Sequence, residues 1–159
     1  MKTQRFLLSM ILLSLITACS NAELGYNEKV TSVFLNQMKN LDEDQKVFSD
    51  STALFHADRS DSTSLDIKAD NLIKNADMGL ADLASFKPSE NAKAFHASVT
   101  QYLNKSKQYG TTIKQILSSA GTEKRTNYLQ ATQQYAELEN MPDKIREIQI
   151  DYQQKAGLK

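Results

Sequence analysis

The chain has few residues that form tight turns or cross-links, with one cysteine, two prolines and five glycines in 159 residues, and it has no tryptophan. A single cysteine excludes an intramolecular disulfide and any metal site that needs two thiolates. The scarcity of proline and glycine argues against an all-β fold, which needs frequent tight turns. Stretches of strict apolar–polar alternation are missing too, so we expect no strands. What remains is a composition suited to helices.

Charge of one sign is not in excess either. Lysine and arginine together number 19, aspartate and glutamate also 19, and the formal net charge is zero. Proteins that bind nucleic acids need a basic excess to neutralise phosphates, so nucleic acid is not an expected partner. The chain also lacks the run of basic residues that would attract anionic lipid headgroups.

The N-terminal region has a basic start followed by a short apolar run. Lys2 and Arg5 precede the run, which covers residues 6–16. Its eleven residues would make a helix of about 16 Å, well short of the roughly 20 apolar residues that cross a membrane. A basic start, a short apolar middle and small residues afterwards are typical of a secretory signal peptide. A transmembrane anchor is the weaker alternative because the run is short.

The apolar run ends in Leu15-Ile16-Thr17-Ala18-Cys19, which resembles the lipobox of bacterial lipoprotein precursors. In that family an aliphatic residue, a small residue and Ala or Gly precede an obligatory cysteine. The resemblance implies cleavage before Cys19, a diacylglycerol thioether on its sulfur and an acyl chain such as palmitate on the new amine. In the proteobacterial pattern, Ser20 in place of Asp implies the outer membrane, at its periplasmic face or at the cell surface.

These features divide the chain into three parts. They are a cleaved signal peptide, residues 1–18, a lipidated cysteine with a short linker, residues 19–25, and one folded domain, residues 26–159. The mature chain would have 159 − 18 = 141 residues, which is the size of a single domain. Because the linker reaches at most about 20 Å when extended, we expect the folded domain to lie close to the membrane.

Apolar residues recur every three or four positions in four long segments, as amphipathic helices require. The segments cover residues 26–55, 65–86, 92–117 and 128–152. We expect Asn27 to cap the first helix, residues 57–64 to form a loop, and Ser89 to cap the third helix. Gly121 is expected to end the third helix, and Pro142 either kinks the fourth or starts a separate helix. The pattern predicts an all-α, up-down-up-down four-helix bundle, with a coiled-coil dimer as the rival architecture.

Side chains suited to catalysis or metal binding are few and lie far apart in the sequence. In the expected bundle His56 and His96 lie about 33 Å apart along the axis, so they cannot share a metal or a proton. Met38 falls within about 6 Å of the height of His96, which leaves a haem-ligating pair as a minor alternative. We expect no catalytic residues, no cofactor and no metal, and the protein is not expected to be an enzyme.

Two pairs of tyrosines are spaced seven residues apart, so each pair shares one helix face. The pairs are Tyr102 with Tyr109 and Tyr128 with Tyr135. Such faces either form an interaction surface or groove for a peptide, a glycan or another helix, or pack at the edge of the bundle with their hydroxyls in water. Both interpretations remain open.

The folded region resembles uncharacterised small helical surface lipoproteins. These open with a Tyr-Asn pair like Tyr26-Asn27 soon after the lipidated cysteine, and continue through a segment like residues 83–103. The resemblance implies a helical fold at the envelope and supplies no catalytic residues. The sequence therefore predicts a non-enzymatic envelope lipoprotein, a binding, adaptor or structural module whose partner is another envelope protein. The alternative is a small-ligand or metal carrier that uses the bundle interior or a tyrosine-lined groove.

Overall fold

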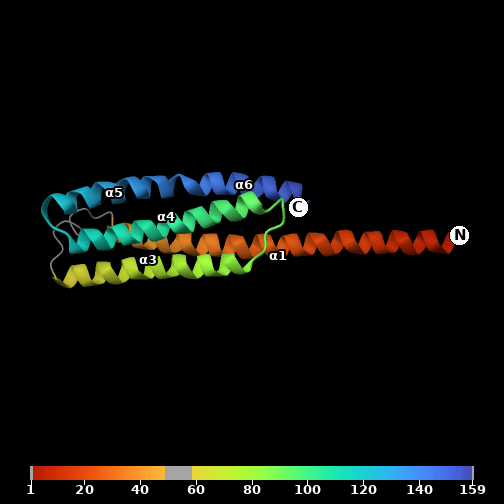
Figure 1. Cartoon of the computed structure of the whole chain (residues 1–159), viewed down its shortest axis with the longest axis horizontal. Helices are drawn as coiled ribbons and strands as arrows, with labels where there is room; N and C mark the ends of the chain where they lie inside the picture. Colours follow the sequence, from red (N-terminus) through yellow and green to blue (C-terminus); the bar gives the residue numbers. More distant parts are fainter. Residues whose placement is uncertain (1, 49–58, 159) are drawn as a thin grey trace.

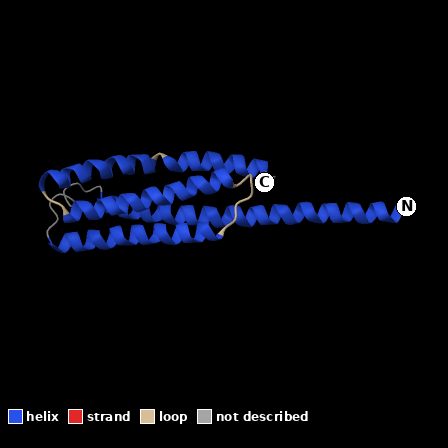
Figure 2. Ribbon diagram, in the orientation of Figure 1, coloured by secondary structure: helices blue, strands red, loops and turns tan. Residues whose placement is uncertain are grey.

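The computed structural model describes the backbone of residues 2–48 and 59–158, and the side chains of residues 21–45, 48 and 62–158. Every regular element in these ranges is an α-helix (Figure 2). The helices are α1 (Lys2–Phe48), α3 (Arg59–Ser85), α4 (Lys93–Ser118), α5 (Gly121–Glu139) and α6 (Met141–Lys155). The all-α prediction is confirmed for the described part of the chain.

The helices pack as a four-helix bundle in which consecutive members run antiparallel (Figure 1). Helices α5 and α6 follow each other along one side and together form the fourth member. Helix α4 packs against α1, α3, α5 and α6, which makes it the centre of the molecule. The predicted bundle topology is therefore confirmed.

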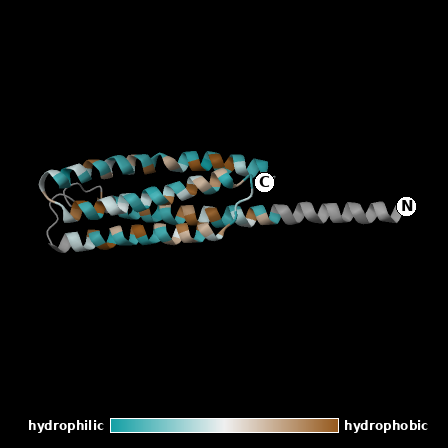
Figure 3. Ribbon diagram, viewed as in Figure 1, coloured by the Kyte–Doolittle hydropathy of each residue, from teal (hydrophilic) through white to brown (hydrophobic). Residues whose placement is uncertain are grey.

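Apolar residues from all five helices form one continuous core. Hydrophobic and hydrophilic residues are interspersed along each helix (Figure 3). Aromatic pairs connect distant helices: Phe34 of α1 meets Tyr102 of α4 edge-on, with ring centroids 5.1 Å apart. Fully burying a large aliphatic or aromatic side chain contributes about 1.5–3 kcal/mol. The fully buried aliphatic residues include Val30, Leu72, Val99, Leu103, Ile113, Ile116, Leu138 and Ile145.

Gly110 permits the close approach of α3 and α4. A Cβ atom at this position would lie 2.9 Å from Cγ1 of Ile73 and 3.2 Å from the carbonyl oxygen of Ala69. Glycine inside a helix costs roughly 0.5–1 kcal/mol relative to alanine because its unfolded chain is more flexible. Here the missing side chain leaves room for the opposing helix, so the closer packing offsets that cost.

The first helix differs from the prediction at its start. Residues 20–25, expected to be a linker, are helical, and α1 continues through them without a break. Asn27 is therefore not an N-cap: it lies inside α1, is buried, and accepts a hydrogen bond of 3.0 Å from Nε2 of Gln149. Ala22, Glu23 and Leu24 favour helix, and contacts with α6 hold this stretch in place.

The second helix begins earlier than its apolar pattern indicated. Helix α3 starts at Arg59, so the loop predicted over residues 57–64 is wrong for residues 59–64. Short polar residues suit the first turn of a helix, where backbone N–H groups lack partners, but they carry no apolar periodicity. Phe55 and His56 lie outside the described residues.

The remaining boundaries follow the predicted turn chemistry in part. The Ser89 hydroxyl accepts a hydrogen bond of 3.3 Å from the backbone N–H of Ala92, but this bond closes the turn before α4, whose N-cap position is Ala92, so Ser89 does not cap the helix itself. Pro142 stands in the first turn of a separate helix, α6, which settles the two options for this residue. Gly121 has the expected positive φ of 56°, but it begins α5, because α4 already ends at Ser118.

Candidate functional site

An aromatic cluster joins α1, α4 and α6 at the end of the bundle where α1 enters (Figure 1). Its members are Glu23, Tyr26, Phe95, His96 and Tyr152. The Tyr152 hydroxyl lies 2.8 Å from both the backbone carbonyl oxygen and Oε2 of Glu23 and donates to them. The Tyr26 hydroxyl and Nδ1 of His96 share a hydrogen bond of 2.7 Å. The Tyr152 ring stacks on Phe95 at 5.8 Å and meets the Tyr26 ring edge-on at 6.3 Å.

The cluster fixes α1 at a point very near the predicted lipid attachment. Glu23 follows Cys19 by four residues, which is about 6 Å along a helix. Apolar stacking and hydrogen bonds to a charged acceptor act together here, and each is worth about 1 kcal/mol or more. The start of the folded domain is therefore held by side-chain contacts with two other helices.

Burial makes the tyrosines of this end hard to ionise. Burial raises the pKa of Tyr26 to about 12, and the nearby carboxylate of Glu23 adds to the effect. Burial is also the main cause that raises the pKa of Tyr152, and the hydrogen bond to Glu23 raises it further. Both hydroxyls therefore act as neutral hydrogen-bonding groups at neutral pH, not as phenolate nucleophiles.

These shifts predict a loss of stability at alkaline pH. The unfolded chain ionises its tyrosines near pH 10, whereas folded Tyr26 stays neutral to about pH 12. The stabilisation is present in full below pH 10 and is lost as the pH rises from 10 to about 12, because the unfolded state then releases protons first. Thermal midpoints recorded against pH, with phenolate absorbance as a second signal, test this. Phenolate formation by every tyrosine near pH 10 without any fall in the midpoint would contradict it.

The structure corrects the predicted heights of Met38 and His96 along the bundle axis. Because His96 contacts Tyr26, it lies level with the start of the bundle, and Met38 is twelve residues further along α1, or about 18 Å. The haem-ligating pair is therefore wrong: α1 extends past its expected cap, which shifts the register of the two helices. Among the described residues, no group of three or more His, Cys, Asp and Glu side chains is placed to hold a metal.

The four tyrosines singled out by their spacing lie on α4 and α5, and the two on α4 also contact α1. Tyr102 and Tyr109 are only 1% and 3% exposed, so the prediction that they form an interaction surface is wrong. Tyr109 donates a hydrogen bond of 2.7 Å to Oε1 of Gln45 and packs 5.9 Å from the ring of Tyr135. Tyr135 and Tyr128 are half-buried. Burial raises the pKa of Tyr102 and of Tyr109, which fits a structural role.

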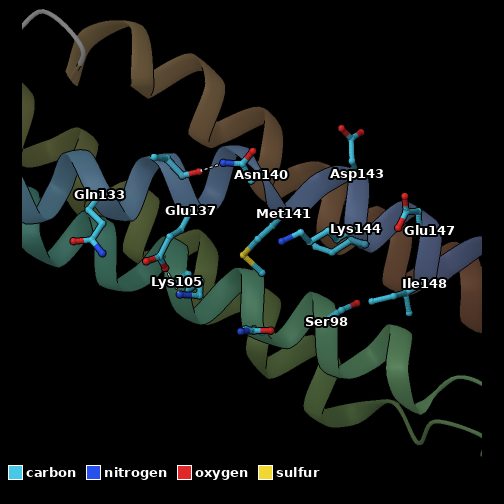
Figure 4. Close-up of a pocket in the computed structure, with 13 residues that line it drawn as sticks. Ser98, Lys105, Gln133, Glu137, Asn140, Met141, Asp143, Lys144, Glu147 and Ile148 are labelled. Carbon is cyan, nitrogen blue, oxygen red and sulfur yellow. Dashed lines mark hydrogen bonds and ion pairs between the residues drawn. The ribbon is translucent and has the colours of Figure 1, made fainter.

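An open groove of about 720 Å³ runs along α4 beside the α5–α6 junction (Figure 4). Apolar side chains of α6, among them the buried Ile145, form part of its wall. Asn140 stands between α5 and α6 and donates a hydrogen bond of 2.6 Å to the Ala136 carbonyl oxygen. We call this region the α4–α6 groove; the residues used below are Gln101, Lys105, Glu137, Met141, Lys144 and Ile148.

Charged side chains of both signs surround the α4–α6 groove. Nζ of Lys105 lies 2.5 Å from Oε2 of Glu137, an ion pair that connects α4 to α5 across the groove (Figure 4). This hydrogen bond and the Lys105 charge lower the pKa of Glu137 below its usual value. Lys144 and Glu147 stand on the α6 side. Sequence reasoning missed this groove, because its walls come from segments about 40 residues apart.

Comparison of the chain with protein-family models, with curated proteins and with solved structures finds no match. Among the described residues, no helix is both long and apolar enough to cross a membrane.

Proposed function

We propose that the mature chain is a non-enzymatic binding module of a bacterial envelope, attached to the outer membrane by lipid on Cys19 after removal of residues 1–18. The observation that supports this most is the contact between Tyr152 and Glu23, four residues after Cys19. Lipid at Cys19 would then hold the base of the bundle within about 6 Å of its attachment point. The module would stand at a defined height above the bilayer.

The partner we propose is an amphipathic segment of another envelope protein, bound in the α4–α6 groove. Met141 is eleven residues from Tyr152 along the fourth member of the bundle, so the groove lies about 22 Å from Cys19 along the axis. Met141 and Ile148 are partly buried and can receive apolar side chains. Lys144 and Glu147 offer charges of both signs at the rim, the arrangement usual in protein interfaces. The partner must therefore reach into the layer next to the membrane.

Site-directed photo-cross-linking in the native envelope tests this proposal. A photoreactive phenylalanine derivative would replace Gln101 on α4 or Lys144 on α6, both exposed side chains lining the groove. The matched control is Asn71, an exposed side chain on α3, which does not border the groove. We expect one saturable protein adduct from Gln101 and Lys144 and none from Asn71.

Two outcomes would contradict different parts of the proposal. Adducts of equal yield from all three positions, or none from the groove positions, would refute the groove as a binding site. A specific groove adduct that persists unchanged in a Cys19→Ala variant would support the binding module but would contradict the need for the lipid anchor.

A further inference from the structure

Two other segments of the chain lie at the end of the bundle where α1 enters (Figure 1). One is the connection between α3 and α4, residues 86–92, and the other is the C-terminal stretch after α6, residues 156–158. This is the end of the bundle nearest to Cys19. We call the surface that these segments form together with the start of α1 the basal surface; the residues used below are Leu24, Phe86, Lys87, Pro88 and Leu158.

The height of this surface relative to Cys19 is set by α1. The backbone of α1 is helical without a break from Cys19 into the bundle, because residues 20–25 form helix where a linker was expected. Cys19 precedes Tyr26 by seven residues, so it lies about 10 Å beyond Tyr26 along the helix axis. A flexible linker would let the bundle take many heights and tilts above an anchor, whereas a continuous helix restricts both.

The connection between α3 and α4 reaches almost to the height of Cys19. His96 is level with Tyr26, because the two side chains share a hydrogen bond. The connection ends at Ala92, four residues before His96, or about 6 Å further toward Cys19. The remaining difference in height between Ala92 and Cys19 is therefore only about 4 Å.

The C-terminal stretch reaches the same height on the other side of α1. Tyr152 is level with Glu23, to which its hydroxyl donates, and Leu158 follows Tyr152 by six residues, or about 9 Å. The N–H groups of Gly157 and Leu158 donate to carbonyl oxygens of α6 at 3.2 and 2.9 Å, the two bonds of a Schellman motif. Gly157 supplies the positive φ of 68° that this motif needs, so Leu158 has a defined position.

Apolar and aromatic groups are accessible on the basal surface. Leu24 is 43% exposed, and Phe86, Pro88 and Leu158 are half-buried. Nζ of Lys29 lies 5.6 Å from the centroid of the Phe86 ring, which places an ammonium group and an aromatic ring together. Side chains that combine an apolar body with a charged tip favour the membrane–water interface, where acyl chains and headgroups meet.

Charges near the basal surface balance each other. Lys93 pairs with Glu90 at 2.6 Å, and Lys155 pairs with Asp151 at 2.7 Å. These pairs give the surface no strong potential of either sign, so it suits a zwitterionic headgroup layer and does not select anionic lipids.

We propose that the basal surface contacts the headgroup layer of the membrane, so that the bundle axis stands steeply on the membrane plane, a contact that rests on the proposed lipid at Cys19. Acyl chains on Cys19 would place that residue at the edge of the hydrocarbon core. The headgroup layer is roughly 5–7 Å thick, and Leu24 lies about 8 Å from Cys19 along α1. Leu24, the α3–α4 connection and Leu158 then meet lipid together.

Fluorescence quenching on the lipidated protein tests the inference, in phosphatidylcholine vesicles that contain a lipid with a nitroxide on its headgroup. A fluorophore would be attached to a cysteine introduced by Lys87→Cys, Leu158→Cys or Thr122→Cys. Thr122 is the matched control, because it is exposed in the first turn of α5, thirty residues before Tyr152, or about 45 Å away along the axis. We expect strong quenching at positions 87 and 158 and none at position 122.

Two α1 variants test whether apolar contact with lipid holds the basal surface in place. Leu24→Glu introduces a charge into the surface, whereas Leu35→Glu changes a leucine of similar exposure, 47%, about 16 Å further along α1. Leu24→Glu should reduce the quenching at position 87 by about half or more, because the leucine no longer removes apolar area from water. Leu35→Glu should leave it unchanged.

Separate outcomes would overturn the inference and the proposed anchor. Equal quenching at all three positions would mean that the bundle lies along the membrane. No quenching at any position in vesicle-bound protein, or equal effects of Leu24→Glu and Leu35→Glu, would overturn the lipid contact while leaving the anchor in place. Wild-type protein that takes up the fluorophore at Cys19 would have a free thiol there, which would refute the anchor itself.

Discussion

Replacing Cys19 with alanine is expected to release the protein from the membrane. One acyl chain alone binds membranes only marginally, with an association constant of about 10⁴ M⁻¹, whereas several chains anchor a protein stably, so the processed protein without them should move almost entirely to the soluble fraction. The release applies to variant protein that is cut elsewhere: because the modified cysteine defines the proposed cleavage, part of the variant should keep residues 1–18 and stay membrane-bound through their apolar run. Fractionation of cell envelopes and the intact mass of the extracted protein measure both effects.

The matched control for this experiment is Ser20→Ala, which keeps the cysteine and should leave the protein membrane-bound. The Cys19→Ala protein should unfold at the same temperature as the wild-type bundle, since residue 19 precedes the aromatic cluster. If the wild-type protein extracted from membranes had the mass of an unmodified thiol at residue 19, the lipid anchor would be disproved.

Replacing Tyr152 with alanine is expected to cost about 3–5 kcal/mol of unfolding free energy, the usual range for a buried aromatic residue. Tyr152 is 1% exposed, stacks on Phe95 and meets Tyr26 edge-on, so its removal leaves a cavity among three helices. Single domains have only about 5–15 kcal/mol in total, so the loss is a large fraction. Urea denaturation followed by circular dichroism measures it.

Two further variants separate packing from hydrogen bonding at this position. Tyr152→Phe keeps the ring and removes the hydrogen bonds to Glu23, so we expect a loss of about 1–2 kcal/mol. Ile150→Ala, an exposed position on the same helix, should cost less than about 1 kcal/mol. Equal effects of Tyr152→Ala and Ile150→Ala would show that the cluster does not stabilise the bundle.

Loss of the cluster also has a consequence for α1. Since Glu23 and Tyr26 hold α1 against α4 and α6, Tyr152→Ala should raise amide hydrogen exchange at residues 21–27 more than in the middle of α4. Uniform changes along the whole chain would mean that the end of α1 is not stabilised separately.

Apolar spacing predicted the helices well where burial is regular. The stripe through Val99, Ile113 and Ile116 lies in the core of α4, as a period of three to four residues requires. The same spacing could not locate the start of α3, because residues 59–64 are polar and carry no such signal. It also placed Tyr102 and Tyr109 on one face correctly while leaving open which way that face points.

Helix ends set by local chemistry were predictable to differing degrees. Pro142 lies in the first turn of α6 because its fixed φ and missing N–H suit that position, whichever helices surround it. Asn27 has a good capping side chain but became a buried hydrogen-bond acceptor, because α1 continues past it toward the N-terminus. Asparagine favours the start of a helix, but the contacts of Asn27 with α6 outweighed that preference.

The sequence by itself determined the helical class, the number of bundle members and the lipobox prediction at Cys19, because each depends on residues near one another in the chain. Only the tertiary structure decided the register that places His96 beside Tyr26 instead of near Met38. It alone produced the α4–α6 groove, whose walls come from separate helices. Burial depends on which faces meet after packing, and that information is not local.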